Sequence, residues 1–381
     1  MKKMKIVVDE NIAFAHEAFS SLGEVTLMHG RKIDNSALKD AGALIVRSIT
    51  EVNAALLEAT PVKFVGTATI GTDHVDLDYL KRQGIAFSDA KGCNADAVAE
   101  YVFTALLYVI NKKGIELKDK SIGVIGVGNI GSRVVRYAKA LGLKVLQNDP
   151  PRERQGGSAD FVGLTEALQS DIVTFHVPLN MEGIDKTYHL INKDNLKLLK
   201  KDAILINASR GAVVDNQALL GYLNKNSDLS VILDVWENEP DIDTGLLVKT
   251  DIASAHIAGY SLEGKVNGTM IVRGALCEFL GCKDEFHPRL PVIENPLIEL
   301  EGNLRLESAL LKAFSSVYNI KDDDLLLKKM HGLPNEQRRV YFDDLRKNYR
   351  LRREFSNFAV KINQSNKFPE TILKEFRFSI L

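Results

Sequence analysis

Short apolar runs alternate with amphipathic stretches along most of the chain. Runs of three to five residues, many of them β-branched, predict buried strands, and stretches with apolar residues three or four positions apart predict helices. In the first 96 residues the predicted strands are Lys5–Val8, Ala43–Val46, Phe64–Gly66 and Ile85–Phe87, and the predicted helices are Ala13–Leu22, Ala54–Ala59 and Val75–Gln83. Such alternation predicts an α/β fold with a parallel sheet.

The same alternation continues after a long helix predicted at Ala95–Asn111. The next predicted strands are Ser121–Ile125, Leu143–Leu146, Ile172–Phe175, Ala203–Asn207 and Val231–Asp234, with helices at Ser132–Leu141, Asn192–Leu199 and Asn216–Asn224. This pattern predicts a doubly wound sheet. We expect the helix Leu262–Leu280 to return to the first domain. That domain would then comprise residues 1–96 and 261–288, with a second domain, residues 97–260, inserted in it.

The pattern changes near Pro291, where three prolines indicate a linker. Residues 289–381 mix predicted strands (Leu297–Leu300, Phe358–Ile362, Arg377–Ile380) with predicted helices (Leu306–Tyr318, Pro369–Phe376), which indicates a small α+β domain. Between them lies the charge-dense span Arg338–Arg353. We interpret it as a solvated helix, the alternative being that its arginines reach the active site of a partner subunit.

Composition limits the function classes. The 381 residues carry a formal net charge of −1, which favours neither nucleic acid nor an anionic membrane as a partner. Three cysteines without metal-ligand spacing suit a reducing compartment and predict no metal site. The start of the chain has no signal-peptide core, and the apolar stretch Ala97–Ile110 is too short to span a bilayer. We therefore expect a cytoplasmic protein that binds small molecules.

A glycine turn is the most informative motif. Gly126, Gly128 and Gly131 follow a predicted strand and open a predicted helix, and Asp149 ends the next predicted strand. In this context the glycines permit a tight turn, approach of the backbone to a pyrophosphate and close helix packing, while the acid accepts hydrogen bonds from a ribose. The motif predicts NAD rather than NADP, although the nearby Arg152 and Arg154 offer cations for a 2′-phosphate.

Three residues beyond this turn suit the oxidation of a 2-hydroxy acid. Arg210, Glu239 and His256 each lie at a predicted strand end or in the loop after it. An arginine holds a carboxylate in a fixed orientation, a histidine accepts the hydroxyl proton, and a carboxylate beside the histidine stabilises its protonated form. Taken singly, each residue could instead have a structural role.

These motifs together resemble the D-isomer-specific 2-hydroxyacid dehydrogenases. The matching stretches within residues 4–285 are the glycine turn, Asp171–Leu179, the Ser-Arg-Gly run, the Trp-Glu-Asn-Glu-Pro run and the loop around His256. The resemblance implies a discontinuous flavodoxin-like substrate domain, an inserted Rossmann NAD-binding domain, and catalytic roles for Arg210, Glu239 and His256. It implies that NAD contacts Gly126, Gly128, Asn129, Ile130, Gly131, Asp149, Val177, Pro178, Ala208, Ser209, Arg210, Asp234 and Gly259.

Further stretches indicate a particular branch of this family. They are Val8–Asn11, Val46–Thr50, Val65–Asp76, Gly92–Asn94 and His256–Gly264. The branch implies a phosphorylated hydroxy acid as substrate, with a hydrogen bond from Tyr260. From their positions at the ends of predicted strands we expect Ser48 and Thr69 to contact the substrate, with Arg47 as the candidate for the phosphate. The branch also implies a homodimer formed through the C-terminal domain. Alternatives are another 2-hydroxy acid, such as 3-phosphoglycerate, or a non-catalytic NAD sensor, which would not need the Arg/Glu/His set.

Overall fold

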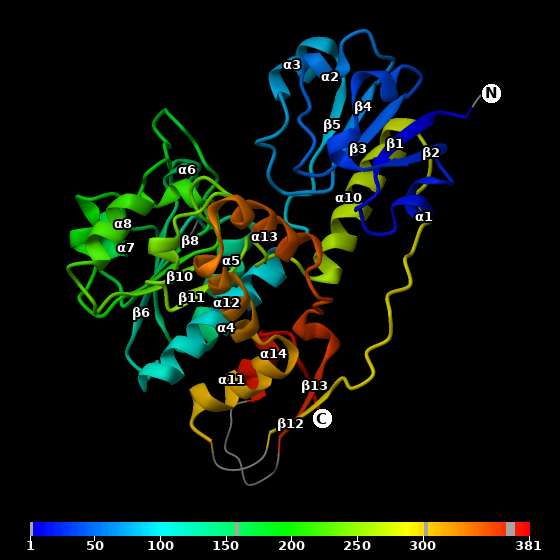
Figure 1. The fold of residues 1–381 in the computed structure, drawn as a ribbon. Coiled ribbons are helices and arrows are strands. Elements are labelled where there is room, and N and C mark those ends of the chain that lie inside the picture. Colours follow the sequence, from blue (N-terminus) through cyan, green and yellow to red (C-terminus); the bar gives the residue numbers. More distant parts are fainter. Residues whose placement is uncertain (1–2, 157–159, 301–303, 363–369) are drawn as a thin grey trace. The chain divides into compact units, whose positions relative to one another are not determined.

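The chain forms two compact units, as seen in a computed structural model (Figure 1). The structure describes residues 3–156, 160–300, 304–362 and 370–381. Unit 1 comprises Met1–Asn94 and Ser261–Val292, and unit 2 comprises Ala95–Tyr260 and Ile293–Leu381. Each unit is described separately below.

Unit 1 is built on a five-stranded parallel sheet. Its strands are β1 (Lys5–Asp9), β2 (Glu24–Met28), β3 (Ala43–Val46), β4 (Phe64–Thr67) and β5 (Ala86–Ser88), in the order β2-β1-β3-β4-β5. This is the flavodoxin-like order. The helices are α1 (Ala15–Phe19), α2 (Ala54–Leu57), α3 (Leu77–Gln83) and α10 (Leu262–Leu280). Alternate side chains of β1 point to opposite faces, so Ile6 packs in one core with Val272 of α10 and Val7 packs in another with Leu80 of α3.

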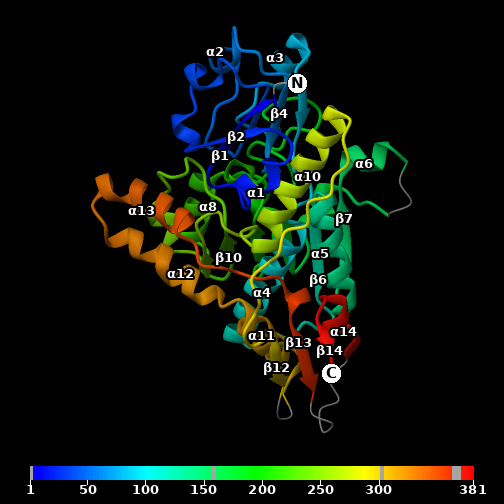
Figure 2. The same ribbon diagram turned by 90° about the vertical axis from the view of Figure 1, so that its right-hand side faces the viewer.

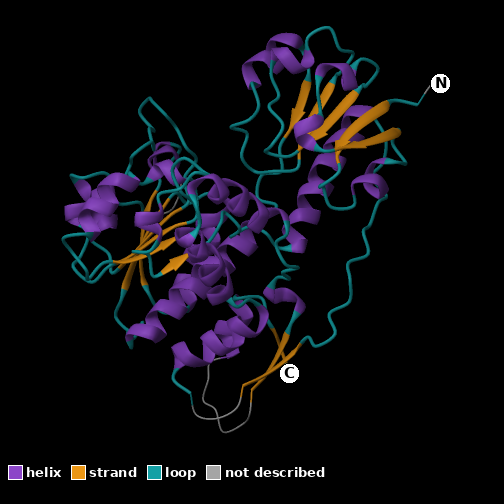
Figure 3. Cartoon of the chain, in the orientation of Figure 1, coloured by secondary structure: helices purple, strands orange, loops and turns teal. Residues whose placement is uncertain are grey.

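Unit 2 contains a six-stranded parallel sheet (orange in Figure 3). Its strands are β6 (Ser121–Ile125), β7 (Lys144–Asn148), β8 (Ile172–Phe175), β9 (Ile204–Asn207), β10 (Ser230–Leu233) and β11 (Ile252–Ala253), in the order β11-β10-β9-β8-β6-β7. A parallel bridge joins Phe161 to Gln147 on the outer side of β7. With that bridge in the place of a third strand, the order is that of the Rossmann fold. The predicted fold class is thus confirmed.

Helices cover both faces of this sheet. The helices of this part of the chain are α4 (Ala95–Lys113), α5 (Asn129–Ala140), α6 (Pro150–Arg154), α7 (Leu164–Leu168), α8 (Asn216–Leu223) and α9 (Thr244–Leu247), of which α6 buries no residue. Ile122 and Val124 of β6 pack in one core with α4 and α5, while Val173 and Leu205 pack in the other with α7 and α8. Since side chains and helices fill the space on both faces of the sheet, the carboxyl ends of the strands are where a ligand can bind.

The C-terminal segment belongs to unit 2. It contains α11 (Leu306–Val317), α12 (Ile320–Lys328), α13 (Asn335–Lys347), α14 (Glu370–Glu375) and the parallel strands β12 (Leu297–Leu300), β13 (Ala359–Ile362) and β14 (Ser379–Ile380). Figure 2 shows this small sheet beside α11 and α14. The rings of Phe314, Phe355 and Phe376 join the core beneath α4 and α5. The predicted boundaries of a separate C-terminal domain stay predictions.

Several elements differ from the sequence-based expectation. Strand β2 was not predicted, because its residues lie at the edge of the sheet and are only partly buried. The stretch Asn192–Leu199 forms only a 3-10 turn at Asn195–Leu198. The span Arg338–Arg353 is not one solvated helix, because α13 ends at Lys347 and the guanidinium of the buried Arg352 donates to the carbonyls of Ala97 and Ala258.

Among the residues that the structure describes, no helix has the length and hydropathy needed to cross a membrane.

Candidate active site

The predicted site residues of unit 2 gather at the carboxyl ends of its central strands. Gly126 follows β6, Asp149 lies one residue beyond β7, Ala208 follows β9 and Asp234 follows β10. The registers place these strand ends side by side: Ile125 pairs with both Asn148 and Phe175, and Asn207 pairs with both Phe175 and Leu233. After β6 the chain adds β7 on one side of the sheet, and after β8 it adds β9 on the other side. The strand order therefore reverses between β6 and β8, and doubly wound folds bind ligands at such a switch point.

The glycine turn fits a dinucleotide. Gly126 has φ 86°, and a Cβ there would lie 2.7 Å from the carbonyl oxygen of His176. A Cβ at Gly131 would lie 1.9 Å from the carbonyl oxygen of Gly126, so only glycine lets α5 begin this close to β6. A Cβ at Gly128 would meet nothing within 4 Å, which leaves open space in front of the first turn of α5. The N–H groups of Asn129, Ile130 and Gly131 in that turn are of the kind that binds a pyrophosphate.

Asp149 is joined directly to the glycine turn. Its Oδ2 accepts a hydrogen bond from the Val127 N–H at 2.8 Å, and its Oδ1 accepts one from the Arg152 N–H at 3.1 Å. Both arginines that could favour a 2′-phosphate have protein partners, since Arg152 donates to the Val127 carbonyl and Arg154 lies 2.5 Å from Asp185 Oδ2. The Asp149 carboxylate thus lies beside the glycine turn, where an acceptor for the ribose hydroxyls is needed. Because both arginines are already paired, the site suits NAD.

The other residues predicted to line the cofactor site lie in three nearby loops. The Val177 side chain lies against the Gly126 turn, and the Pro178 carbonyl accepts a hydrogen bond from Thr187 Oγ1 at 2.5 Å. Ser209 bonds through its N–H and Oγ to Asn207 Oδ1, at 3.1 and 2.8 Å. Ala208 precedes Ser209, and Gly259 lies within the loop that carries His256. Their predicted contacts with NAD stay predictions.

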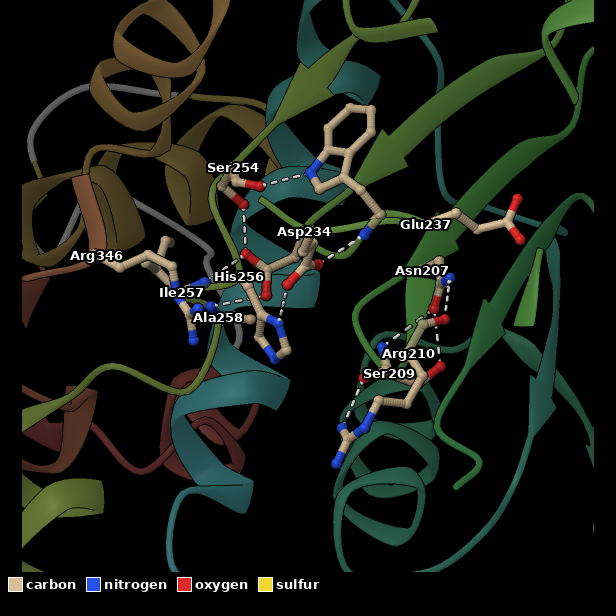
Figure 4. A network of polar contacts seen from close by, with 12 residues as sticks. Asn207, Ser209, Arg210, Asp234, Glu237, Ser254, His256, Ile257, Ala258 and Arg346 are labelled. Carbon is tan, nitrogen blue, oxygen red and sulfur yellow. Dashed lines mark hydrogen bonds and ion pairs between the residues drawn. The ribbon is translucent and has the colours of Figure 1, made fainter. Parts of the chain in front are cut away.

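Asp234 holds the loop that carries His256. Its carboxylate is buried and accepts hydrogen bonds from Ser254 Oγ at 2.6 Å, the Ile257 N–H at 2.8 Å and the Ala258 N–H at 3.0 Å (Figure 4). Burial raises the pKa of Asp234, although His256 and the three hydrogen bonds act in the opposite direction. The structure therefore gives Asp234 a positioning task in addition to its predicted place at the nicotinamide.

His256 and Glu239 form the centre of the site. Nδ1 of His256 lies 2.7 Å from Oε2 of Glu239, whose Oε1 accepts the Trp236 N–H at 2.8 Å. Burial tends to raise the pKa of Glu239, but His256 and the Trp236 N–H outweigh it and hold that pKa below its ordinary value. An ionised carboxylate only accepts, so Nδ1 carries the hydrogen and Nε2 keeps its lone pair. This arrangement makes Nε2 a base.

The backbone at His256 is held in an uncommon conformation. Its φ is 55°, in the left-handed region that residues other than glycine rarely adopt. The His256 N–H donates to the Asp234 carbonyl at 2.7 Å, and the next two N–H groups donate to the Asp234 carboxylate. The loop is therefore fixed at three successive residues, which determines the direction of the imidazole.

Arg210 lies in the neighbouring loop after β9. Asn207 Nδ2 donates to the Arg210 carbonyl at 2.9 Å, and Arg210 Nη1 donates to the Ser209 carbonyl at the same distance. A Cβ at Gly211 would lie 1.8 Å from the Trp236 carbonyl, so this loop packs directly on the loop that carries Glu239. In Figure 4 the side chains of Arg210 and His256 both extend downward from the sheet edge. The structure thus presents the predicted cation and base on adjacent loops.

Tyr260 has a partner that sequence reasoning missed. Arg346, near the end of α13, donates from Nη2 to Tyr260 Oη at 3.2 Å, and the ring of Tyr349 packs edge-on against Tyr260 at 5.8 Å. The span Arg338–Arg353 is dense in arginines, but no spacing or motif distinguishes Arg346 from the others. Only the fold brings it to this loop, within one chain.

The predicted substrate residues of unit 1 share one sheet edge. Arg47 and Ser48 follow β3, and Thr69 lies just beyond the neighbouring β4. Thr69 Oγ1 lies 2.7 Å from Thr67 Oγ1 and donates to the Gly71 carbonyl at 3.1 Å. Ser48 is exposed and Arg47 is half-buried. These residues lie at the carboxyl edge of their own sheet, and their substrate contacts stay predictions.

One cluster has ligand types that suit a metal. His189, Asp215 and Glu237 offer atoms within 4.8 Å of one another. His189 Nε2 is bonded to Glu237 Oε1 at 2.7 Å, Glu237 Oε2 accepts the Asn216 N–H at 2.7 Å, and Asp215 caps α8. Hydrogen bonds within the protein thus account for these side chains, and we assign the cluster no metal.

Comparison with known proteins extends this picture. The family model for the NAD-binding domain of D-isomer specific 2-hydroxyacid dehydrogenases matches residues 109–258, and a model described as a domain of unknown function matches residues 289–374. Over 360 residues, 94% of each chain, the sequence is 49% identical to erythronate-4-phosphate dehydrogenase of Proteus mirabilis and 50% identical to that of Escherichia coli.

Solved structures of dehydrogenases are also similar. D-lactate dehydrogenase of Aquifex aeolicus, complexed with NAD and lactic acid, is 26% identical with a TM-score of 0.58, over 73% of this chain and 95% of that one. NAD-bound 3-phosphoglycerate dehydrogenase of Entamoeba histolytica has a TM-score of 0.63 at 24% identity, over 73% of this chain and 96% of that one. The second likeness is one of fold.

Proposed function

The chain belongs to the D-isomer specific 2-hydroxyacid dehydrogenases, and from this we propose that it oxidises 4-phospho-D-erythronate to 2-oxo-3-hydroxy-4-phosphobutanoate with NAD. The observation that carries the reaction type is the 2.7 Å contact between His256 Nδ1 and Glu239 Oε2. The choice of substrate rests on the relatives that are 49–50% identical over 94% of their length. Their name also supports a role in the synthesis of pyridoxal phosphate.

The protein groups divide the reaction as follows. Arg210 holds the substrate carboxylate, because a guanidinium can donate two parallel hydrogen bonds to it. His256 Nε2 takes the proton of the C2 hydroxyl, and Glu239 stabilises the resulting imidazolium. NAD, held by the glycine turn and Asp149, would supply the acceptor for the hydride that leaves C2, and the products would be the 2-oxo acid, NADH and a proton.

For the cofactor we propose that the turn of Gly126, Gly128 and Gly131 binds the pyrophosphate and that Asp149 binds the adenosine ribose. The fit of the turn supports this, since the space in front of Gly128 is open and Asp149 is bonded to Val127 within the turn. The nicotinamide half of NAD would be held by Asp234 and by the loops at Val177–Pro178, Ala208–Arg210 and Gly259.

For the substrate we propose contacts from Tyr260 and from Arg47, Ser48 and Thr69. Tyr260 lies four positions after His256 in the same loop. The three residues of unit 1 lie at the ends of two adjacent parallel strands, which is where such sheets bind ligands.

We further propose that the enzyme works in the cytoplasm as a homodimer that pairs through its C-terminal segment. Exposed apolar side chains there, Leu325, Val340 and Leu351, support a protein interface. Light scattering coupled to gel filtration tests the dimer.

The function is tested by following NADH absorbance with purified protein and a panel of 2-hydroxy acids. We expect 4-phospho-D-erythronate to have the highest kcat/KM, with 3-phosphoglycerate well below it. A preference for 3-phosphoglycerate would overturn the substrate, and binding of NAD without turnover on any acid would overturn the enzymatic role.

A further inference from the structure

Helix α13 carries a cation to the loop that contains the proposed base. Arg346 Nη2 donates to Tyr260 Oη at 3.2 Å, and its guanidinium carbon lies 5.9 Å from the centre of the Tyr260 ring. Tyr260 follows His256 by four residues in a loop fixed by Asp234. Figure 4 shows Arg346 reaching this loop from the C-terminal segment, beside Ile257 and Ala258.

Arg346 differs from the arginines around it in how it is paired. Arg350 forms an ion pair with Asp323, and Arg352 donates to the backbone carbonyls of Ala97 and Ala258. Among the described residues, Arg346 has no carboxylate within ion-pair distance, and its buried Nε has no hydrogen-bond partner. A half-buried guanidinium with unused donors is costly unless an anion completes it.

The guanidinium of Arg346 stays protonated. Burial by itself would lower the pKa of Arg346, but Tyr260, Glu239 and Asp234 together raise it above its ordinary value. The same interactions show that Arg346 and Glu239 act on each other electrostatically, since Arg346 also helps to lower the pKa of Glu239. A permanent positive charge with free donors therefore lies close to the catalytic pair.

The proposed substrate carries two anionic groups, and the reaction assigns its carboxylate to Arg210. The remaining group is the phosphate, a near-dianion whose oxygens match the forked donors of a guanidinium.

We propose that Arg346 and the Tyr260 hydroxyl bind the phosphate of the substrate, so that the C-terminal segment of the same chain determines specificity for a phosphorylated acid. This inference rests on the proposed function. It gives the C-terminal segment a direct role in substrate recognition.

The test compares Arg346→Gln with wild type on 4-phospho-D-erythronate and on unphosphorylated D-erythronate. We expect kcat/KM for the phosphorylated acid to fall about 10- to 100-fold, mainly through KM, since a hydrogen-bonded charge is lost. The value for D-erythronate should fall less, because that acid has no phosphate to lose, and any loss there measures the effect of Arg346 on Tyr260 and Glu239. Arg346→Lys, which keeps the charge without the fork, should recover part of the loss, and Tyr260→Phe should show a smaller loss of the same kind.

Lys347→Gln is the matched control, because it removes one positive charge from the next, exposed position of the same helix. It should leave both substrates unaffected. Melting temperatures of all variants separate a folding defect from a binding defect. Equal losses on both acids in Arg346→Gln and Arg346→Lys would overturn the proposal and make Arg346 a structural residue.

Calorimetric titration with inorganic phosphate in the absence of substrate gives a readout that does not depend on turnover. We expect phosphate to bind wild type and Lys347→Gln equally and to bind Arg346→Gln more weakly. Equal binding to wild type and Arg346→Gln would overturn the phosphate assignment. Wild type could fail to oxidise 4-phospho-D-erythronate while Arg346→Gln still binds inorganic phosphate more weakly than wild type. In that case the proposed function is wrong and the anion site stands.

Discussion

Nδ1 of His256 and Oε2 of Glu239 lie 2.7 Å apart, at the edge where the parallel strands of unit 2 end. The contact uses the nitrogen that faces the protein and leaves Nε2 for the substrate. Glu239 is itself fixed by the Trp236 N–H, and His256 by its own N–H bond to the Asp234 carbonyl. The pair is therefore prepared before substrate binds.

Replacing His256 by glutamine should remove the base while keeping a side chain that can reach Glu239. We expect kcat to fall by about 10²- to 10⁴-fold, the usual contribution of a general base, with little change in the affinity for NAD. Stopped-flow measurement of NADH formation, together with an NAD titration, checks both quantities. Normal oxidation at neutral pH would refute the assignment.

Glu239→Gln should have a smaller effect with a diagnostic pH dependence. The pKa of Glu239 is held below its ordinary value, so the carboxylate is ionised at neutral pH. Without that charge the protonated imidazole loses a favourable partner, and the acid limb of the kcat profile should move to lower pH. We expect the maximal rate to fall as well. An unchanged acid limb would show that the two residues do not titrate as a pair.

Two glycines of the turn should respond differently to alanine. A Cβ at Gly131 would lie 1.9 Å from the Gly126 carbonyl, so Gly131→Ala should destabilise unit 2 by about 1–3 kcal/mol. Gly128→Ala meets nothing within 4 Å and should leave the melting temperature of the free protein unchanged. Because the added methyl enters the space proposed for the pyrophosphate, NAD affinity should nevertheless fall. Equal melting temperatures for both variants would contradict the packing argument.

Asp149→Ser should reduce the preference for NAD over NADP. The serine can still accept a hydrogen bond but carries no charge to hold the ribose or to repel a 2′-phosphate. We expect kcat/KM for NAD to fall about 10- to 100-fold, as for loss of a hydrogen bond to a charged group, and the value for NADP to fall less. Steady-state kinetics with both cofactors checks this. An unchanged ratio would remove Asp149 from the ribose site.

The sequence predicted the parts of this structure that depend on local pattern. Strands β3, β6, β8 and β12 and helix α10 have the predicted bounds, because each is an apolar or periodic run with clear ends. Strand β2 is not predicted because it lies at the edge of the sheet, where side chains are less buried and need not form an apolar run. The third Rossmann strand was not visible either, since only the bridge at Phe161 represents it.

Among site residues the same division applies. The sequence alone identifies the glycine turn and the loops that carry Arg210, Glu239 and His256. Their chemistry requires particular residue types at fixed positions after strands. Arg346 follows no such rule, because its place depends on how α12 and α13 pack against the loop of Tyr260. The positioning role of Asp234 was likewise hidden, since it consists of hydrogen bonds to residues about twenty positions away.

Asp171→Asn offers a test of stability that is independent of catalysis. Asp171 Oδ2 accepts from the N–H and Oγ of Ser121 at 2.9 and 2.7 Å, and Oδ1 lies 3.0 Å from Lys200 Nζ. Burial alone would raise the pKa of Asp171, but Ser121 and Lys200 outweigh it and lower that pKa to about 2. These contacts join the start of β6 to the residue before β8, at the amino ends of the two strands.

Because the folded-state pKa of Asp171 is below the unfolded value, its charge stabilises the protein above about pH 4, and the contribution is lost as the pH falls toward 2. Because Asp171 is partly exposed and its partner Lys200 is about half exposed, solvent screening reduces the contribution of this shift to about 1 kcal/mol. We therefore expect Asp171→Asn to lower the free energy of unfolding by about that amount at neutral pH, as measured in urea, and the difference from wild type to shrink below about pH 4. Asp228→Asn, which breaks the exposed pair with Lys201, is the control and should change little. A deficit in Asp171→Asn that stays constant with pH would mean that its cause is packing and not charge.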